Sequence, residues 1–220
     1  MSRVGTRKNA SLAAGIGVLI AILAAIALSW GERSFTAHMV VHMAIVAIAA
    51  PLVATVLSGS RADLTRHLPW LGPLLASLIE LVIVWIWHVP AMRGAVEAAP
   101  FLGLFEQATF LAGGLLLWLT CLGGAADGRT GRRLAGAIGL LFTSMHMTLL
   151  GVLLALSPRP LYGDGDVTCF GIPLTGGTDQ QLGGVVMLAI GAASYLIGGV
   201  ALLSGILRDD GPLKAENAQC

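Results

Sequence analysis

Two histidine–methionine pairs, His38–Met39 and His42–Met43, stand at the start of a long apolar segment. Residues four positions apart lie on the same face of a helix, so both imidazoles can face one partner. Imidazole nitrogen and thioether sulfur are ligands that suit copper, and thioether favours Cu(I). Because these ligands are neutral, they can surround one monovalent cation without burying several charges. The spacing therefore predicts a copper site.

Two further histidines lie, like the first pair, in the half of the predicted membrane spans that faces away from the cytoplasm. His88 ends an apolar run in WIWHVP, and Pro90 is expected to stop the helix just after it. His146 lies between two methionines in SMHMTLLG. Those three residues span about 200° of helix surface, so His146 and at most one methionine can face a single site. His88 and His146 are candidate ligands, whereas His67 is expected in a solvated loop.

Three acidic residues are placed where they could support such a site. Glu80 lies near the middle of an apolar segment, where an ionised carboxylate costs roughly 2.5–3.5 kcal/mol, so it should be paired, protonated or facing a cavity. Glu106 lies near the outer end of another segment, where it could interact with the helix dipole or orient a histidine ligand. Asp179 is a candidate N-cap of the last predicted helix and could equally face the outer pocket.

Simpler explanations and rival functions stay open at this point. A single histidine in a membrane helix usually forms a hydrogen bond with a neighbouring helix, and methionine usually packs. His42 and His88 could instead be the axial ligands of a b-type haem in an electron carrier. A metal-free structural subunit or scaffold is a further alternative. No Ser/His/Asp set, phosphate-binding loop or HExxH motif is present, so no enzyme activity is expected.

The composition predicts the elements that must position these residues. The chain has 220 residues, of which 56% are hydrophobic and 11% are charged. Soluble domains average about 25% charged residues, so an integral membrane protein is expected. The formal net charge of +1 and the lack of a basic patch give no reason to expect a nucleic-acid partner. Six predicted spans make an all-α bundle: roughly 10–30, 35–57, 70–89, 102–122, 134–156 and 181–206.

The basic residues predict the orientation of this bundle. Ten of the 13 Lys and Arg residues lie on the side that holds both termini, which is therefore expected to be cytoplasmic. The predicted parts are a tail at 1–9, six spans within 10–207 and a tail at 208–220. The first span could alternatively be a cleaved signal peptide. Pro51 should kink the second span, with neighbouring helices bonding the freed carbonyl groups.

Several segments also carry a family resemblance. They are HMVVHMAIVAIAAPLVATVLSG at 38–59, WHVP at 87–90, FLAGGLLLW at 110–118, PRPLYG at 158–163 and DQQLGGVVM at 179–187. In this order they resemble the polytopic CtaG family of cytochrome c oxidase assembly proteins, which differs from the single-span copper chaperone of the same name. The segments cover most of the chain after the first span.

The resemblance implies a multi-pass protein of the bacterial inner membrane that is needed to make a haem–copper oxidase and helps copper to reach it. The implied partners are oxidase subunits or other assembly factors, together with membrane lipid. The residues that match the family's histidines are His38, His42 and His88. One departure concerns the family's HxxEH segment: residues 103–107 keep its glutamate as Glu106 but have neither histidine. Either that part of the family's metal site is altered, or His146 takes over part of it.

Overall fold

The structure is a computed structural model that describes residues 34–60, 63–68, 70–123 and 129–217, together with positions 13, 16, 17 and 20. The predicted span at 10–30 lies outside the described residues except for those four positions. The elements in chain order are α2 (Phe35–Met43), the π-helix η1 (Ala44–Ala49), α3 (Ala50–Leu57), the 3-10 helix η2 (Leu64–Arg66), α4 (Pro73–Trp87), α5 (Pro90–Ala98), α6 (Pro100–Leu122), α7 (Arg129–Ala155), β1 (Asp166–Cys169), β2 (Ile172–Thr175) and α8 (Gly176–Asn217).

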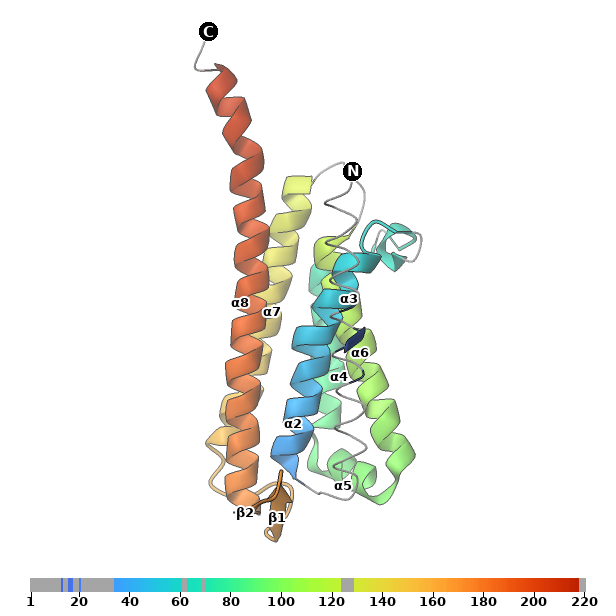
Figure 1. The fold of residues 1–220 in the computed structure, drawn as a ribbon, viewed down its shortest axis with the longest axis vertical. Helices are drawn as coiled ribbons and strands as arrows, with labels where there is room; N and C mark the ends of the chain where they lie inside the picture. The colour runs from blue at the N-terminus through green and yellow to red at the C-terminus, as the bar shows by residue number, and fades with distance from the viewer. Residues whose placement is uncertain are drawn as a thin grey trace.

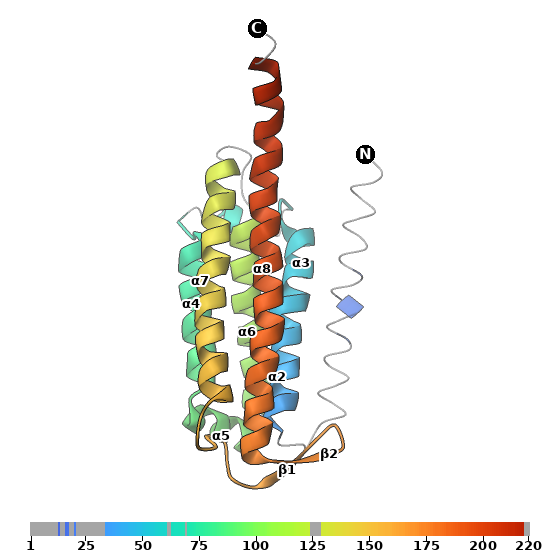
Figure 2. The same cartoon turned by 90° about the vertical axis from the view of Figure 1, so that its left-hand side faces the viewer.

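The long helices run side by side in one bundle, with α8 packed along α7 and α2 (Figures 1 and 2). Four described helices are long and apolar enough to cross a membrane: Phe35–Leu57, Phe101–Leu122, Thr130–Ala155 and Gly176–Leu207. A fifth span is formed if α4 and α5, which meet at a bend of 68°, are counted together. These five match the predicted second to sixth spans, so the all-α multi-span fold is confirmed over the described part of the chain.

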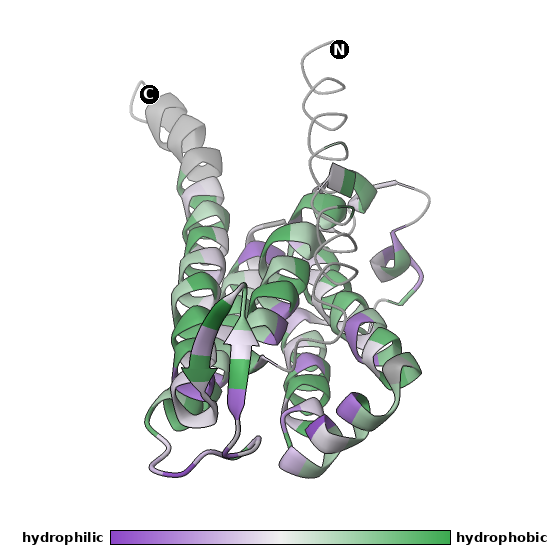
Figure 3. Cartoon of the chain, turned by 60° about the horizontal axis from the view of Figure 1, so that its bottom comes forward, coloured by the Kyte–Doolittle hydropathy of each residue, from purple (hydrophilic) through white to green (hydrophobic). Residues whose placement is uncertain are grey.

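The long helices consist mostly of hydrophobic residues, and hydrophilic residues gather in the loops and at scattered positions within the helices (Figure 3). This distribution is the one a bilayer requires, because charged groups are costly in hydrocarbon. The loop between η2 and α4 carries His67, which is exposed as expected. At the opposite end of the bundle lie α5 and the β1–β2 hairpin (Figure 1).

Pro51 is accommodated by the π-helical segment η1 and by two neighbouring helices. Because proline has no N–H, the carbonyl of Ala47 loses its usual partner four residues later. The hydroxyl of Ser194 on α8 donates to that carbonyl at 2.6 Å. The indole Nε1 of Trp118 on α6 donates to the carbonyl of Val46 at 3.2 Å. The prediction that neighbouring helices bond the freed carbonyls is therefore confirmed.

Glycines let α7 and α8 approach closely. A Cβ atom on Gly184 would lie 2.7 Å from the backbone nitrogen of Ala155 and 2.8 Å from the carbonyl oxygen of Gly151. A Cβ on Gly151 would in turn lie 3.1 Å from the carbonyl oxygen of Gly184. Small residues at such crossings allow backbone contact between membrane helices. This contact holds α8 against the rest of the bundle.

Two predicted outer loops contain secondary structure that the sequence reading missed. Pro90 ends α4 as expected, but the chain then starts the short helix α5 instead of an irregular loop. Pro90 is favoured at the first position of a helix, which explains why α5 begins there. In the second loop, β1 and β2 form an antiparallel hairpin that pairs Asp166 with Thr175 and Cys169 with Ile172.

Candidate functional site

The structure brings three of the predicted histidines together at the end of the bundle that holds α5 and the hairpin. The ring centres of His42 and His88 lie 5.6 Å apart, and those of His38 and His88 lie 6.5 Å apart. The ring of Phe110 on α6 packs against His42 with a centre-to-centre distance of 3.9 Å. The i, i+4 spacing on α2 and the end of α4 therefore place the three imidazoles around one aromatic side chain.

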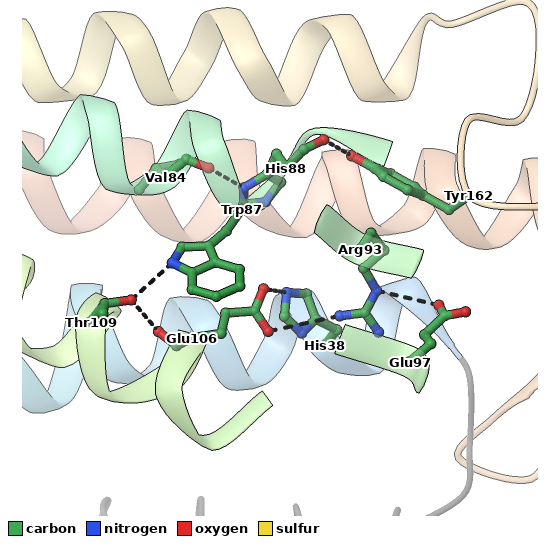
Figure 4. A network of polar contacts seen from close by, with 9 residues as sticks. All are labelled: His38, Val84, Trp87, His88, Arg93, Glu97, Glu106, Thr109 and Tyr162. Atoms are coloured by element: carbon green, nitrogen blue, oxygen red, sulfur yellow. Dashed lines mark hydrogen bonds and ion pairs between the residues drawn. The ribbon is translucent and has the colours of Figure 1, made fainter. Parts of the chain in front are cut away.

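Backbone contacts fix the position of His88. It caps the C-terminus of α4 with helical φ and ψ angles, and its Nδ1 lies 2.6 Å from the carbonyl oxygen of Val84 (Figure 4). A carbonyl can only accept, so Nδ1 carries the proton and the lone pair of a neutral ring lies on Nε2. The hydroxyl of Tyr162 donates to the carbonyl of His88 at 2.9 Å. The side chain of His88 is thus held with Nε2 free to act as a ligand.

Within the described residues, three ring nitrogens of this cluster have no hydrogen-bond partner. They are both nitrogens of His42 and the Nε2 of His88. His42 is 0% exposed and His88 is 7% exposed, so water does not reach these nitrogens easily. Burying a polar atom without a partner costs about 1–3 kcal/mol. Such atoms need an explanation, and a bound cation is one.

A chain of charged groups extends from His38 through Glu106 and Arg93 to Glu97. The Nε2 of His38 lies 3.4 Å from the Oε1 of Glu106 (Figure 4). The Nη1 of Arg93 lies 4.0 Å from the Oε2 of Glu106, and its Nε lies 3.4 Å from the Oε1 of Glu97. Glu106 is thus beside a histidine of the cluster, as predicted. It lies in the second turn of α6, because that helix starts at Pro100, so the dipole of the first turn does not explain its position.

An aromatic pair covers the cluster from the loop side. Tyr162 stacks on Phe35 with ring centres 4.4 Å apart and an interplanar angle of 16°. The ring of Phe35 lies 6.2 Å from that of His38 and 6.3 Å from that of His88. Burial raises the pKa of the Tyr162 phenol to about 12, although the nearby positive charge of Arg93 partly opposes this. The phenol therefore stays a hydrogen-bond donor at ordinary pH.

Asp179 caps a different helix from the one predicted. It lies in the first turn of α8, but its carboxylate accepts hydrogen bonds from the Ser34 hydroxyl and from the backbone N–H groups of Phe35 and Thr36. The N-cap prediction for its own helix is therefore wrong. The physical reason is that the unpaired N–H groups at the start of α2 lie beside it and attract a negative charge.

The other three predicted metal ligands, Met39, Met43 and His146, contact other parts of the bundle. The Cγ of Met39 is 3.1 Å from where a Cβ on Gly183 would lie, and the Sδ of Met43 is 3.9 Å from the same position on Gly191. Both side chains thus contact α8. His146 is buried on α7, and its described ring contact is with Phe142 on the same helix.

Glu80 belongs to a separate polar group deeper in the bundle. The Tyr195 hydroxyl donates to its Oε1 and the Thr143 hydroxyl donates to its Oε2, each at 3.3 Å. Ser77 forms a short hydrogen bond with Thr143. These four side chains are at most 1% exposed and join α4 to α7 and α8. Glu80 is thus hydrogen-bonded inside the bundle, as the sequence led us to expect.

The arrangement of potential ligands sets limits on the chemistry. In the part of the chain that the structure describes, no group of three or more His, Cys, Asp or Glu side chains is arranged to hold a metal ion. A histidine nitrogen lies about 2 Å from a bound metal, so two rings on one ion have centres up to about 6.3 Å apart. The His42–His88 separation of 5.6 Å fits such a two-histidine pair. The two partner-free residues of the cluster are therefore the ones that fit a metal best.

Sequence reasoning missed two residues that shape this site. Arg93 appeared only as a charge in an outer loop, yet its side chain is buried beside Glu106 because α5 turns back over the cluster. Tyr162 lay in the PRPLYG segment, which carried the family resemblance but gave no sign of a contact with His88. A buried arginine follows from the fold of α5, and nothing in the local sequence signals it.

Comparisons with known proteins identify one family. The sequence profile of the family described as "Cytochrome c oxidase caa3 assembly factor (Caa3_CtaG)" matches residues 2–209. Searches of curated proteins and of solved structures found no matching chain. The family match covers nearly the whole chain, including every helix of the described bundle that contributes to the histidine cluster. The chain therefore belongs to the caa3-type cytochrome c oxidase assembly factor family.

Proposed function

We propose that this assembly factor binds one copper ion transiently at His42 and His88, beside His38, and assists its delivery to a haem–copper oxidase. The observation that carries the proposal is the 5.6 Å separation of two buried rings whose free nitrogens have no partner among the described residues. Imidazole suits copper, and Cu(I) accepts as few as two such ligands. The family match supports the assembly role, and the histidine pair supports copper as the cargo.

The proposed site faces the outer side of the bacterial cytoplasmic membrane. The start of α2 and the end of α4, which carry the cluster, lie at the end of the bundle that holds α5 and the hairpin, opposite the start of α7 (Figure 1). Arg132 and Arg133 belong to that start of α7. Basic residues favour the cytoplasmic side, so the cluster belongs to the outer half. A partner that donates or receives copper, such as an oxidase subunit or another assembly factor, would approach this outer end.

The test compares cells that make the wild type, the His42→Ala plus His88→Ala variant, or the His67→Ala control. The control removes an exposed histidine at the other end of the bundle. We expect the double variant to insert normally and to leave the oxidase short of copper and activity, whereas the control should match the wild type. Normal oxidase activity in a normally inserted double variant would contradict the proposal and would favour a metal-free scaffold.

A b-type haem between His42 and His88 is the rival that the sequence left open, but trans axial imidazoles need ring centres about 6.3 Å apart, more than the 5.6 Å found here. The close packing of Phe110 on His42 argues against it, since a flat macrocycle needs that space between the rings. The visible spectrum of the purified protein separates the two. A Soret band at one haem per chain would replace the copper proposal.

A further inference from the structure

Three charged side chains beside the histidine cluster determine its charge. Arg93 is 9% exposed and Glu106 is 1% exposed, and their charged groups lie 4.0 Å apart. The guanidinium of Arg93 also faces Glu97, at 3.4 Å. When both carboxylates are ionised and the three imidazoles are neutral, one guanidinium and two carboxylates give this group a net charge of −1. Guanidinium stays protonated in proteins, so Arg93 contributes a fixed positive charge.

A buried positive charge next to a site for a cation is unexpected and needs a reason. Without Arg93, the two carboxylates would give a charge of −2, which would be balanced by a divalent ion. With Arg93, the net charge of the group is −1, which one monovalent cation balances. Charges without a counter-charge are costly inside a protein, so the total after binding decides which ion is favoured. A monovalent ion brings the total to zero, and a divalent ion leaves +1.

We propose that Arg93, Glu97 and Glu106 make the histidine cluster selective for a monovalent soft cation, Cu(I), over divalent Cu(II). Arg93 is the residue that sets this selectivity, because it cancels one of two carboxylates that would otherwise attract a divalent ion. The inference rests on the proposed function, since it assigns the oxidation state of the ion at the same site. It assigns Arg93 no direct contact with the ion.

The contribution of each carboxylate should follow its burial. The Glu106 side chain is 1% exposed and contacts His38, whereas the Glu97 side chain is 27% exposed. Water weakens the effect of a partly exposed charge. Replacing Glu106 should therefore change ion binding more than replacing Glu97, although both substitutions remove one negative charge. Glu97→Gln is the matched control for Glu106→Gln.

The test measures the affinities of purified full-length protein for Ag(I), a redox-inert substitute for Cu(I), and for Cu(II). A unit charge about 10 Å from an ion changes its affinity by on the order of tenfold at an effective dielectric constant of about 20. Arg93→Gln should shift the ratio of affinities toward Cu(II) by on the order of tenfold. Glu106→Gln should shift it toward Ag(I) and weaken both. The Arg93→Gln plus Glu106→Gln variant keeps the charge of −1 and should restore the wild-type ratio.

The double variant separates charge from geometry. If Glu106 acts only by orienting His38, the double variant will bind as weakly as Glu106→Gln, and the proposal is wrong. If Arg93→Gln does not fold, the comparison of Glu106→Asp with Glu106→Gln decides. Glu106→Asp keeps the negative charge and must keep the wild-type ratio of affinities. Glu106→Gln loses the charge and must shift that ratio. Wild-type protein that binds neither ion would overturn the copper function as well. Wild-type protein that binds Ag(I), with an unchanged ratio in the charge variants, would overturn the selectivity alone.

Discussion

The hydroxyl of Ser194 on α8 lies 2.6 Å from the carbonyl oxygen of Ala47, the group that Pro51 leaves without its usual backbone partner. This contact ties the proline-containing helix of the histidine cluster to α8. The two helices also meet at Asp179, which caps the start of α2. The α2–η1–α3 helix is therefore held against α8 by polar contacts at its start and near its middle.

Ser194→Ala should lower the free energy of unfolding by about 1 kcal/mol, the usual net value of one hydrogen bond. In a Pro51→Ala background the loss should be smaller, because the substituted alanine would supply the missing backbone N–H. Thermal unfolding in detergent would measure both. The control is Ser204→Ala, since that exposed hydroxyl bonds only to the carbonyl of Ala201 on its own helix. Equal losses in both backgrounds would contradict this account.

Gly184→Ala should separate α7 from α8 and destabilise the bundle by about 1–3 kcal/mol. The added methyl group would lie within 2.8 Å of backbone atoms of Ala155 and Gly151, and backbone atoms move less easily than side chains. Gly199→Ala on the same helix is the matched control, because no atom lies within 4 Å of its added Cβ. The two variants should therefore differ clearly in resistance to SDS-induced unfolding. Similar behaviour would show that the close approach is not needed.

Glu80→Gln should be tolerated much better than Glu80→Ala. The amide oxygen can still accept one of the hydrogen bonds donated by Tyr195 and Thr143, whereas alanine leaves both donors buried without an acceptor. Because alanine also leaves a cavity, Glu80→Ala should lower the free energy of unfolding by about 2–4 kcal/mol. Chemical unfolding in detergent checks the order. A glutamine variant as unstable as the alanine variant would show that the carboxylate itself is required.

Tyr162→Phe should remove the hydrogen bond to His88 and keep the stacking on Phe35. We expect the free energy of unfolding to fall by about 0.5–1.5 kcal/mol at neutral pH. The folded protein holds the phenol proton more tightly than the unfolded chain, whose tyrosine pKa is about 10. The contribution of Tyr162 is thus complete below pH 10 and is lost as the pH rises toward about 12. Unfolding measured between pH 9 and pH 12 should show the wild type and Tyr162→Phe converging.

The histidine cluster could be predicted because two simple rules determine it. The i, i+4 spacing of His38 and His42 places them on one face, and the alternation of spans places His88 at the same end of the bundle. The rotation of each helix about its axis could not be predicted. A helix that is apolar on all sides gives no sign of which face meets which neighbour, so nothing showed that Met39 and Met43 would face α8.

Contacts between distant segments were also beyond the local sequence. Asp179 fits the rule for capping its own helix, but the start of α2 lies beside it in the folded chain. Arg93 reaches Glu106 only because Pro90 both ends α4 and starts α5, at a bend of 68°. The general positions of the spans followed from hydropathy, whereas these two partners depend on the packing of the whole bundle.

The most direct test of the copper assignment is a titration of the purified full-length protein with Cu(I) against a coloured Cu(I) chelator. The wild type should take one ion per chain, and His42→Ala plus His88→Ala should lose this binding. Met39→Leu plus Met43→Leu should retain it, because those side chains contact α8. A double-histidine variant that is folded and binds Cu(I) as tightly as the wild type would contradict the assignment.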